Sequence, residues 1–192
     1  MFKVLKDLRQ KGFDYLNLSD KELIDRFIRG DDKAFRFLYE RYVNRIYSMA
    51  YRFCRNYETS KDITQEVFLR LYQKKERYNP VISFNTFFYR LAYNCILNYL
   101  RDHKEQPIDE WSMQQITTHP ASPEENLFAT ESARRIEKII DELPERQKTA
   151  FILNKIEGLS YNEIAEVMNL NLNVVKSLIH RATLKVLEVE NE

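Results

Sequence analysis

Apolar residues recur every three or four positions through much of the first half of the chain. After the pair Asp31-Asp32, which is typical of a helix start, one apolar stripe continues for about twenty residues. The stripe consists of Phe35, Leu38, Tyr39, Tyr42, Ile46, Ala50 and Cys54. This spacing puts the side chains on one face of an α-helix, so it predicts an amphipathic helix with a buried face.

Two further stripes follow at the same spacing. A helix that begins near Thr59-Ser60 turns one apolar set inward, namely Ile63, Val67 and Leu71. A helix from about Asn85 to Arg101 has an apolar face made of Phe84, Phe88, Leu91, Cys95 and Tyr99. Together the three stripes predict an amino-terminal unit of at least three helices.

Residues 158–182 have the pattern of two short helices joined by a tight turn. The segment reads GLSYNEIAEVMNLNLNVVKSLIHRA. Ser160 and Glu163 have the spacing of a capping box, and Asn169 tolerates the left-handed backbone that a tight turn needs. We expect Asn173 to cap the second helix, whose buried stripe is Val175, Ile179 and Ala182. The pattern predicts a helix-turn-helix, which lays its second helix in the major groove of DNA.

The composition favours an all-α fold. The 192 residues include three Gly and five Pro, and no long apolar–polar alternation predicts strands. Residues 103–129 lose the helical period and contain Pro107, Pro120, Pro123 and the only tryptophan, Trp111. We therefore expect an amino-terminal extension (1–20), a helical domain (21–102), a flexible linker (103–129) and a second helical domain (130–192). Trp111 is expected to anchor on a neighbouring domain, with a contact to a partner as the alternative.

Compartment and cofactor signals are few. Cys54 and Cys95 match no metal or disulfide framework. No apolar run approaches the roughly 18 residues of a membrane span, and the first ten residues are too polar for a signal peptide. We expect a cytoplasmic protein with no metal, no cofactor and no direct membrane insertion.

The net charge of +1 is unevenly distributed. Residues 21–102 carry sixteen Lys or Arg against ten Asp or Glu, a net charge of +6. Residues 130–192 carry nine against eleven, a net charge of −2. A DNA-binding protein that works alone gains much of its affinity by neutralising phosphates, so the helix-turn-helix unit carries too little charge to act alone.

The helix over 85–101 also carries a polar stripe. Its members are Thr86, Arg90, Asn94, Asn98 and Arg101. Asn and Arg can bind base edges and phosphates, although an ordinary solvated face has the same pattern. Eight aromatic residues lie between positions 72 and 99, more than a three-helix core needs, which suits stacking with unpaired bases. The loop at 78–83 precedes the stripe and could border a pocket for an extruded base.

The helix near residue 60 has a different outward face. It combines acidic and apolar side chains, with Phe68 at the edge; the others are Asp62, Gln65, Glu66, Leu69 and Arg70. Such a face repels DNA but suits a protein partner, and an ordinary amphipathic helix remains the alternative.

Three blocks of the sequence carry a further signal, namely DITQEVFLRLYQ, SFNTFFYRLAYNCILNYLRD and LPERQKTAFILNKIEGLSYNEIAEVMNLNLNVVKSLIHRA. In their order and spacing they resemble the bacterial RNA polymerase sigma factors of the sigma-70 type, in the small extracytoplasmic-function (ECF) group. They resemble, in order, region 2.2, which docks on the polymerase beta-prime subunit, regions 2.3–2.4, which melt and read the minus-10 element, and region 4, which reads the minus-35 element. The resemblance implies core RNA polymerase (beta-prime and beta subunits), promoter DNA and an anti-sigma factor as partners.

The resemblance also implies which residues contact each partner. The residues expected to bind core polymerase are Asp62, Gln65, Glu66, Phe68, Leu69 and Arg70. The residues expected to contact the minus-10 element are Tyr78, Asn79, Ser83, Asn85, Thr86, Phe87, Arg90, Asn94, Asn98 and Arg101. The residues expected to contact the minus-35 element are Asn173, Val174, Lys176, Ser177, His180 and Arg181. Val174 and Leu178 stand where the family commonly has threonine and arginine, so we expect a minus-35 preference that differs from the commonest one.

If the resemblance holds, the weak charge of the helix-turn-helix unit is explained, because core polymerase supplies phosphate contacts. In addition, once one of two tethered DNA-binding modules is bound, the high effective concentration of the other raises the overall affinity. A stand-alone regulator is the main alternative, since GLSYNEIA also resembles the DNA-binding domain of LuxR-type response regulators. That alternative leaves the amino-terminal helices unexplained. An enzyme is disfavoured: His103, His119 and His180 are scattered, and no phosphate-binding loop or metal-ligand spacing is present.

Overall fold

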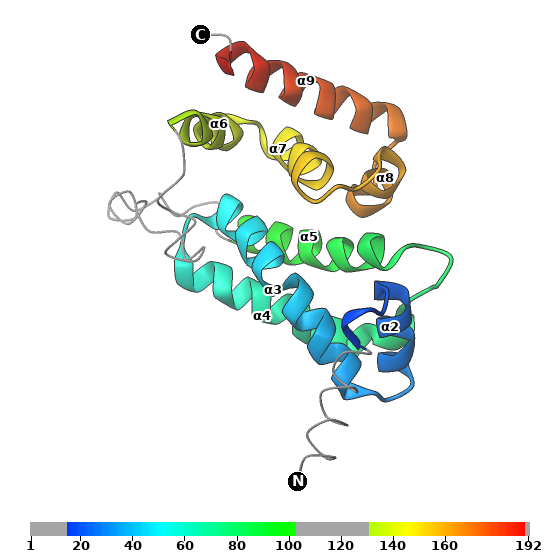
Figure 1. Cartoon of the computed structure of the whole chain (residues 1–192). Helices are drawn as coiled ribbons and strands as arrows, with labels where there is room; N and C mark the ends of the chain where they lie inside the picture. Colours follow the sequence, from blue (N-terminus) through cyan, green and yellow to red (C-terminus); the bar gives the residue numbers. More distant parts are fainter. Residues whose placement is uncertain (1–14, 103–130, 191–192) are drawn as a thin grey trace.

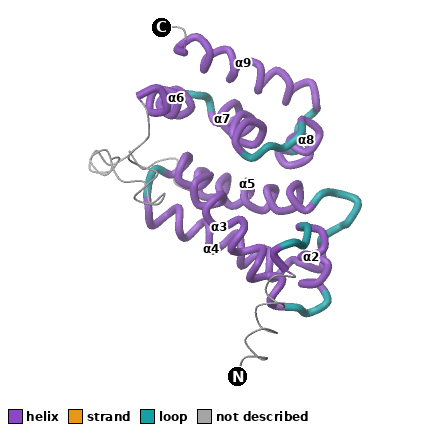
Figure 2. Tube along the Cα trace, viewed as in Figure 1, coloured by secondary structure: helices purple, strands orange, loops and turns teal. Residues whose placement is uncertain are grey.

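The chain folds into helices and loops throughout the part that is described. The computed structural model describes residues 15–102 and 131–190. The first range holds α2 (Asp20–Ile28), α3 (Asp32–Cys54), α4 (Tyr57–Lys74), the 3₁₀ turn η1 (Lys75–Arg77) and α5 (Phe84–Asp102). The second holds α6 (Glu131–Glu142), α7 (Glu145–Phe151), the π-helical η4 (Ile152–Ile156), α8 (Tyr161–Met168) and α9 (Leu172–Glu190). No strand occurs in these two ranges, which confirms the all-α expectation (Figure 2).

Side-chain caps determine where the first helices begin. Asp31 accepts a hydrogen bond from the Lys33 N–H at 3.1 Å and caps α3, as its position predicts. Asn56 caps α4, so this helix begins slightly before the predicted Thr59-Ser60 start. The sequence pattern did not reveal α2, although Ser19 and Glu22 form a complete capping box at its start.

The amino-terminal module, residues 15–102, is held together by one apolar core. Helices α2, α3, α4 and α5 pack against their neighbours in the chain, and α5 also contacts α3. Every predicted inward position of α4 is buried, as are Leu38, Tyr42 and Ile46 of α3. Burying an apolar side chain of this size contributes about 1.5–3 kcal/mol, so the shared core stabilises all four helices together.

The carboxy-terminal module, residues 131–190, contains the predicted helix-turn-helix. Helix α9 packs across α6, α7 and α8. The capping box of Ser160 and Glu163 is present, and Asn169 adopts a left-handed backbone with φ 52°. The cap of α9 is Asn171 and not Asn173, because Asn171 Oδ1 accepts the Asn173 N–H at 2.9 Å. The chain turns into α9 two residues earlier than predicted, since Leu172 already begins the helix.

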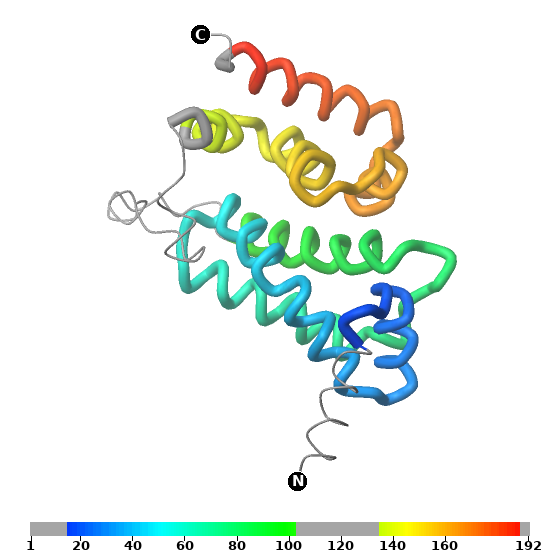
Figure 3. The backbone as a smooth tube through the Cα atoms, viewed as in Figure 1, coloured from blue at the N-terminus to red at the C-terminus, as the bar shows by residue number. Residues whose placement is uncertain are grey.

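The two modules lie against each other. Helix α8 packs on α5, and Figure 1 shows α7 and α8 above α5, with α3 and α4 on its other side. Figure 3 shows the same order along the chain: the blue-to-green half forms one layer and the yellow-to-red half the other. The predicted linker, including Trp111, and most of the predicted extension lie outside the described residues.

Candidate DNA and polymerase interfaces

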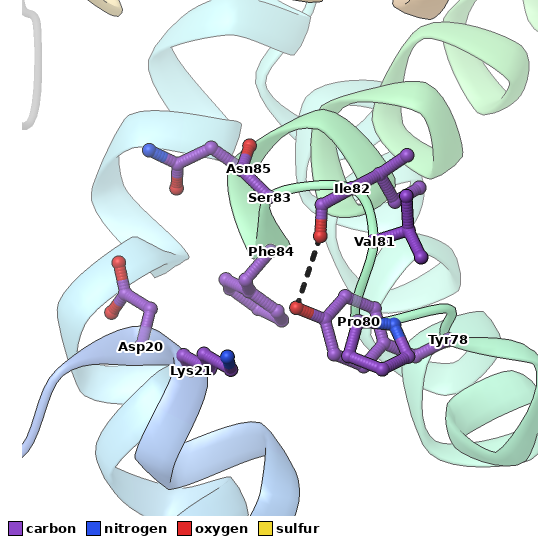
Figure 4. Close-up of a pocket in the computed structure, with 9 residues that line it drawn as sticks. All are labelled: Asp20, Lys21, Tyr78, Pro80, Val81, Ile82, Ser83, Phe84 and Asn85. Atoms are coloured by element: carbon purple, nitrogen blue, oxygen red, sulfur yellow. Dashed lines mark hydrogen bonds between the residues drawn. The ribbon is translucent and has the colours of Figure 1, made fainter.

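A pocket lies beside the loop that precedes α5 (Figure 4). Its volume is about 390 Å³, and its lining consists of Asp20, Lys21, Tyr78, Pro80, Val81, Ile82, Ser83, Phe84 and Asn85. Within the loop, the Tyr78 hydroxyl donates to the Ile82 carbonyl oxygen at 3.2 Å, and the Val81 N–H donates to Asn79 Oδ1 at 3.0 Å. Because these side chains hold the backbone of the loop, the wall of the pocket is formed before any ligand arrives.

One end of the pocket is a small polar network. The Tyr42 hydroxyl lies 2.5 Å from Asp20 Oδ2 and 2.6 Å from Asn85 Oδ1, and Arg41 holds the other Asp20 oxygen. Burial, together with the hydrogen bond to Asp20, raises the pKa of Tyr42, so its phenol keeps the proton and stays a donor. A hydroxyl has one proton to give, so Asp20 and Asn85 share a single donor. Carboxylate and amide groups of this kind are the ones that pair with base edges.

The residues predicted to contact the minus-10 element begin at this pocket. Tyr78, Ser83 and Asn85 line it, and Asn79 shapes its loop. Phe87 is half-buried, with its ring centroid 5.4 Å from that of Tyr78. The structure therefore brings this half of the predicted set together around one cavity.

The rest of the predicted minus-10 set lies along α5, and only part of it faces solvent. Asn94 and Arg101 are exposed and Asn98 is half-buried. Thr86 is buried, at 1% exposure, and Arg90 is bound to the carboxy-terminal module through Glu166. The polar stripe is thus interrupted, because the other module covers its first turns.

The expected surplus of aromatic residues is mostly core. Five of the eight are buried, namely Tyr78, Phe84, Phe88, Tyr89 and Tyr93. The rings of Phe84, Phe88 and Tyr89 meet that of Tyr42 edge to face, with ring centroids 5.2–6.4 Å apart, and Phe84 stacks on Phe88. The aromatic count alone therefore does not favour base stacking, since a core of aromatic pairs accounts for most of it.

Three of the six residues predicted to bind a protein through α4 are exposed, Glu66 and Arg70 are half-buried, and Phe68 is buried. Asp62, Gln65 and Leu69 are exposed, while Glu66 is half-buried and pairs with Arg70 at 2.6 Å. Phe68 does not lie at the edge: it is 4% exposed and packs against aromatic rings of α3 and α5. Two exposed aromatic residues, Tyr39 and Tyr72, lie beside this face. The prediction that Tyr39 belongs to the buried stripe of α3 is therefore wrong, because its ring lies at the margin of the core against Phe68 and stays open to solvent.

The recognition helix of the helix-turn-helix presents its predicted residues to solvent. All six are exposed: Asn173, Val174, Lys176, Ser177, His180 and Arg181. The opposite side of α9 is buried at Val175, Ile179 and Ala182, as predicted. Leu178 is half-buried and packs on the core, so it offers DNA less surface than its neighbours.

Asp20 and Lys21 of the pocket were also missed by sequence reasoning. They begin α2, whose S-x-x-E signature at 19–22 was the available signal. A larger omission is a set of carboxylates on the carboxy-terminal module that contact the amino-terminal one. The set consists of Asp141, Glu157, Glu163 and Glu166. Nothing local in the sequence marks them, because their partners are distant along the chain.

The described residues offer no site for a metal ion and no helix long and apolar enough to cross a membrane. Cys54 and Cys95 are free thiols, and burial raises the pKa of Cys54 to about 12 and that of Cys95 to about 11. His103 and His119 lie outside the described ranges.

Comparison with known proteins identifies the family to which the chain is similar. The sigma-70 region 2 model matches residues 38–106, and the sigma-70 region 4 model matches residues 133–186. The ECF RNA polymerase sigma-E factor of Haemophilus influenzae is 34% identical over 174 residues, covering 86% of this chain and 92% of that protein. The Escherichia coli sigma-E factor is 33% identical with 86% and 91% covered, and the Pseudomonas aeruginosa sigma-H factor is 31% identical with 85% and 89% covered.

Solved structures share the fold. CnrH, solved in complex with the cytosolic domain of CnrY, matches with a TM-score of 0.66 at 19% identity, covering 90% of this chain and 97% of that chain. The sigma factor RpoE of Bartonella quintana, solved with the anti-sigma factor NepR, matches with a TM-score of 0.66 at 16% identity, covering 83% and 98%.

A chain that carries both regions in this order is a bacterial transcription initiation factor. It belongs to the sigma-70 family of RNA polymerase sigma factors, in the ECF group. The stand-alone regulator is not favoured, because it leaves the region 2 match unexplained.

Proposed function

We propose that the two modules divide promoter recognition between them. In this proposal α4 docks on core RNA polymerase, the pocket and α5 bind and open the minus-10 element, and α9 reads the minus-35 element. The proposed domain limits are 21–102 for region 2 and 130–192 for region 4. The protein acts with core polymerase in the cytoplasm by binding and positioning, and not as an enzyme.

The observation that carries this proposal is the preformed pocket at the start of α5. It combines an apolar wall, which includes Val81 and Phe84, with the fixed polar groups of Asp20 and Asn85. Its volume of about 390 Å³ lies within the range of roughly 300–1,000 Å³ found for small-ligand sites. An extruded base needs this combination of stacking surface and edge contacts, and its capture offsets part of the few kcal/mol that unstacking costs.

The experiment measures strand opening. Holoenzyme is assembled from core polymerase and the chain, and a promoter is selected from a randomised library. The Asn79→Ala/Asn94→Ala variant should reduce permanganate reactivity of melted thymines on duplex DNA much more than it reduces closed-complex binding. A template that is already mismatched in the minus-10 region has no unpairing cost left, so it should partly restore the variant.

Two controls separate base capture from other effects. Asn79→Ser retains a side-chain oxygen for the turn that Asn79 makes with Val81, so it tests whether the loop has simply lost its shape. Asn44→Ala removes an exposed asparagine of α3 that is outside the predicted set. Equal melting by wild type and the double variant on duplex DNA would mean that the polar stripe is only a solvated helix face.

We also propose that an anti-sigma factor holds this chain. Support comes from the Bartonella quintana structure, whose title describes a sigma factor with its anti-sigma factor. Co-purification of the chain from its own host, followed by identification of the bound protein, tests this. Recovery of core polymerase subunits alone, under conditions where the chain is inactive, would contradict it.

A further inference from the structure

The recognition helix has a local charge that differs from that of its module. Residues 130–192 have a net charge of −2, but positions 169–187 contain no Asp or Glu and three basic residues, namely Lys176, Arg181 and Lys185. Helix α9 is also the outer layer of the carboxy-terminal module, packed on α6, α7 and α8 (Figure 1). Its exposed face therefore lacks the carboxylates that would repel DNA over this stretch.

One exposed side chain in the first two turns of α9 is apolar. Val174 has an exposed fraction of 44%, whereas the other exposed large apolar residues among the described side chains of this helix, Leu184 and Leu187, come ten or more residues later. At a rise of about 1.5 Å per residue, ten residues span about 15 Å, more than the roughly 12 Å width of the major groove. In a helix-turn-helix the amino-terminal residues of the second helix contact base edges. Val174 is therefore the exposed apolar side chain of α9 that is placed to meet a base.

Val174 is continuous with a second apolar residue on the helix surface. Positions three and four apart are neighbours on a helix, so Val174 lies next to Ser177 and Leu178. Leu178 is half-buried and packs on the core, whereas Ser177 is exposed. Val174 and Leu178 are also the two positions where the family commonly has threonine and arginine. In this chain two polar side chains are thus replaced by one apolar strip that extends from the core to the DNA-facing side of α9.

The chemistry of an exposed valine selects one feature of the major groove. Its two methyl groups neither donate nor accept hydrogen bonds, so they do not distinguish the donors and acceptors of base edges. The apolar group that the major groove offers is the C5-methyl of thymine, and apolar side chains contact it there. Valine has one strongly preferred χ1 rotamer in a helix, so its methyl groups are already oriented before contact. Burying one methyl-sized group on contact changes affinity by about four-fold.

We propose that Val174 reads a thymine of the minus-35 element through its C5-methyl group, with Leu178 connecting it to the core. This inference rests on the proposed role of α9 in reading the minus-35 element. It makes Val174 a specificity-determining residue, which selects a T·A pair over a C·G pair at one position without forming a hydrogen bond. A recognition helix with few charges is then sufficient, because part of its selectivity comes from an apolar contact.

The test removes the methyl group and leaves every hydrogen-bonding group of the DNA in place. Holoenzyme is assembled from core polymerase and the full chain, and a promoter is selected from a randomised library. Each thymine of its minus-35 element, on both strands, is then replaced singly by deoxyuridine. Closed-complex affinity is measured by competition against the unmodified promoter. With wild-type holoenzyme, one position should lose about four-fold in affinity.

The Val174→Ala variant distinguishes a contact with this side chain from other effects of the missing methyl group. It should bind the unmodified promoter about as weakly as wild type binds the deoxyuridine promoter, and deoxyuridine at the same position should cost it almost nothing further. Because Val174 is exposed and alanine is the better helix former, the variant is expected to unfold at nearly the wild-type temperature. Leu184→Ala is the matched control: Leu184 is 46% exposed on the same helix, and its variant should retain the full deoxyuridine effect.

Three results would overturn the proposal. A selected minus-35 element with no thymine on either strand would leave nothing for Val174 to read. Deoxyuridine that is tolerated at every position would show that no methyl group is read. A deoxyuridine effect of the same size in Val174→Ala would mean that another side chain or the shape of the DNA detects the methyl group. Failure of the proposed role of α9 is distinguishable, because a scrambled minus-35 element would then bind wild-type holoenzyme as well as the selected one does.

Discussion

Leu69 offers a direct test of the proposed docking face on α4, because it is apolar and half exposed. Its exposed fraction is 51% in the free chain. Complete burial of a leucine side chain is worth about 1.5–3 kcal/mol, so covering the remaining half against core polymerase would contribute about 0.8–1.5 kcal/mol. A tenfold change in affinity corresponds to about 1.4 kcal/mol. Leu69→Ala should therefore weaken binding to core polymerase by about three- to ten-fold.

The assay is a competition between fluorescently labelled wild-type chain and unlabelled variants for a limited amount of core polymerase. Leu184→Ala is the matched control, because Leu184 is 46% exposed and lies on α9, away from α4. Its affinity for core should stay near the wild-type value. Thermal unfolding of each variant shows whether a weaker competitor is still folded.

Phe68 separates an effect on folding from an effect on binding. It is in the predicted docking set but is only 4% exposed. Phe68→Ala should therefore cost about 3–5 kcal/mol of folding stability, whereas Leu69→Ala should unfold at nearly the wild-type temperature. Leu69→Ala with unchanged core affinity would refute the assignment of this face of α4, since the calculation depends only on its being covered.

Three other predictions concern charge and base reading. Asp62→Arg/Glu66→Arg should reduce recovery of core polymerase in a pull-down while circular dichroism stays unchanged, because both side chains lie on the outer face and the substitution reverses its charge. Glu58→Arg/Glu76→Arg is the control. Equal recovery of core polymerase by both double variants would argue against docking through Asp62 and Glu66. Arg181→Ala should cost about 1–3 kcal/mol of minus-35 binding by holoenzyme if the guanidinium pairs with a base, whereas Lys185→Ala, one turn further along α9, should cost less. Leu178→Arg should change the sequence preference in a selection from a randomised minus-35 library, and identical preferences for both proteins would count against this placement of α9.

Much of the fold is predictable from the sequence because its signals are local. The capping box at Ser160, the left-handed Asn169 and the apolar stripes of α3, α4 and α5 each depend on residues within a few positions of one another. Some helix starts differ from the prediction by a few residues, because two polar residues near a turn can both serve as a cap. For α9, Asn173 is the predicted cap, and the structure has Asn171.

The rest of the site depends on distant pairs that periodicity does not encode. Thr86 has the spacing of a solvated polar stripe, yet Glu163, far along the chain, covers it. Phe68 sits at the edge of an ideal α4 stripe, but rings from α3 and α5 enclose it. In each case a helix drawn alone has a polar or edge position, and only packing against another helix decides whether water reaches it.

The order of contacts along the chain has a consequence for how the protein is made. Within the amino-terminal module most helix contacts join elements that are neighbours in sequence, so this module has low contact order and is expected to fold quickly on its own. The bonds from Arg45 and Ser83 to the carboxy-terminal module span 112 and 80 residues. During synthesis, when amino-terminal domains generally fold first, the surface of α5 is therefore complete before Glu163 leaves the ribosome. Each new molecule therefore passes through an interval in which the proposed nucleic-acid surface of α5 is folded and still uncovered.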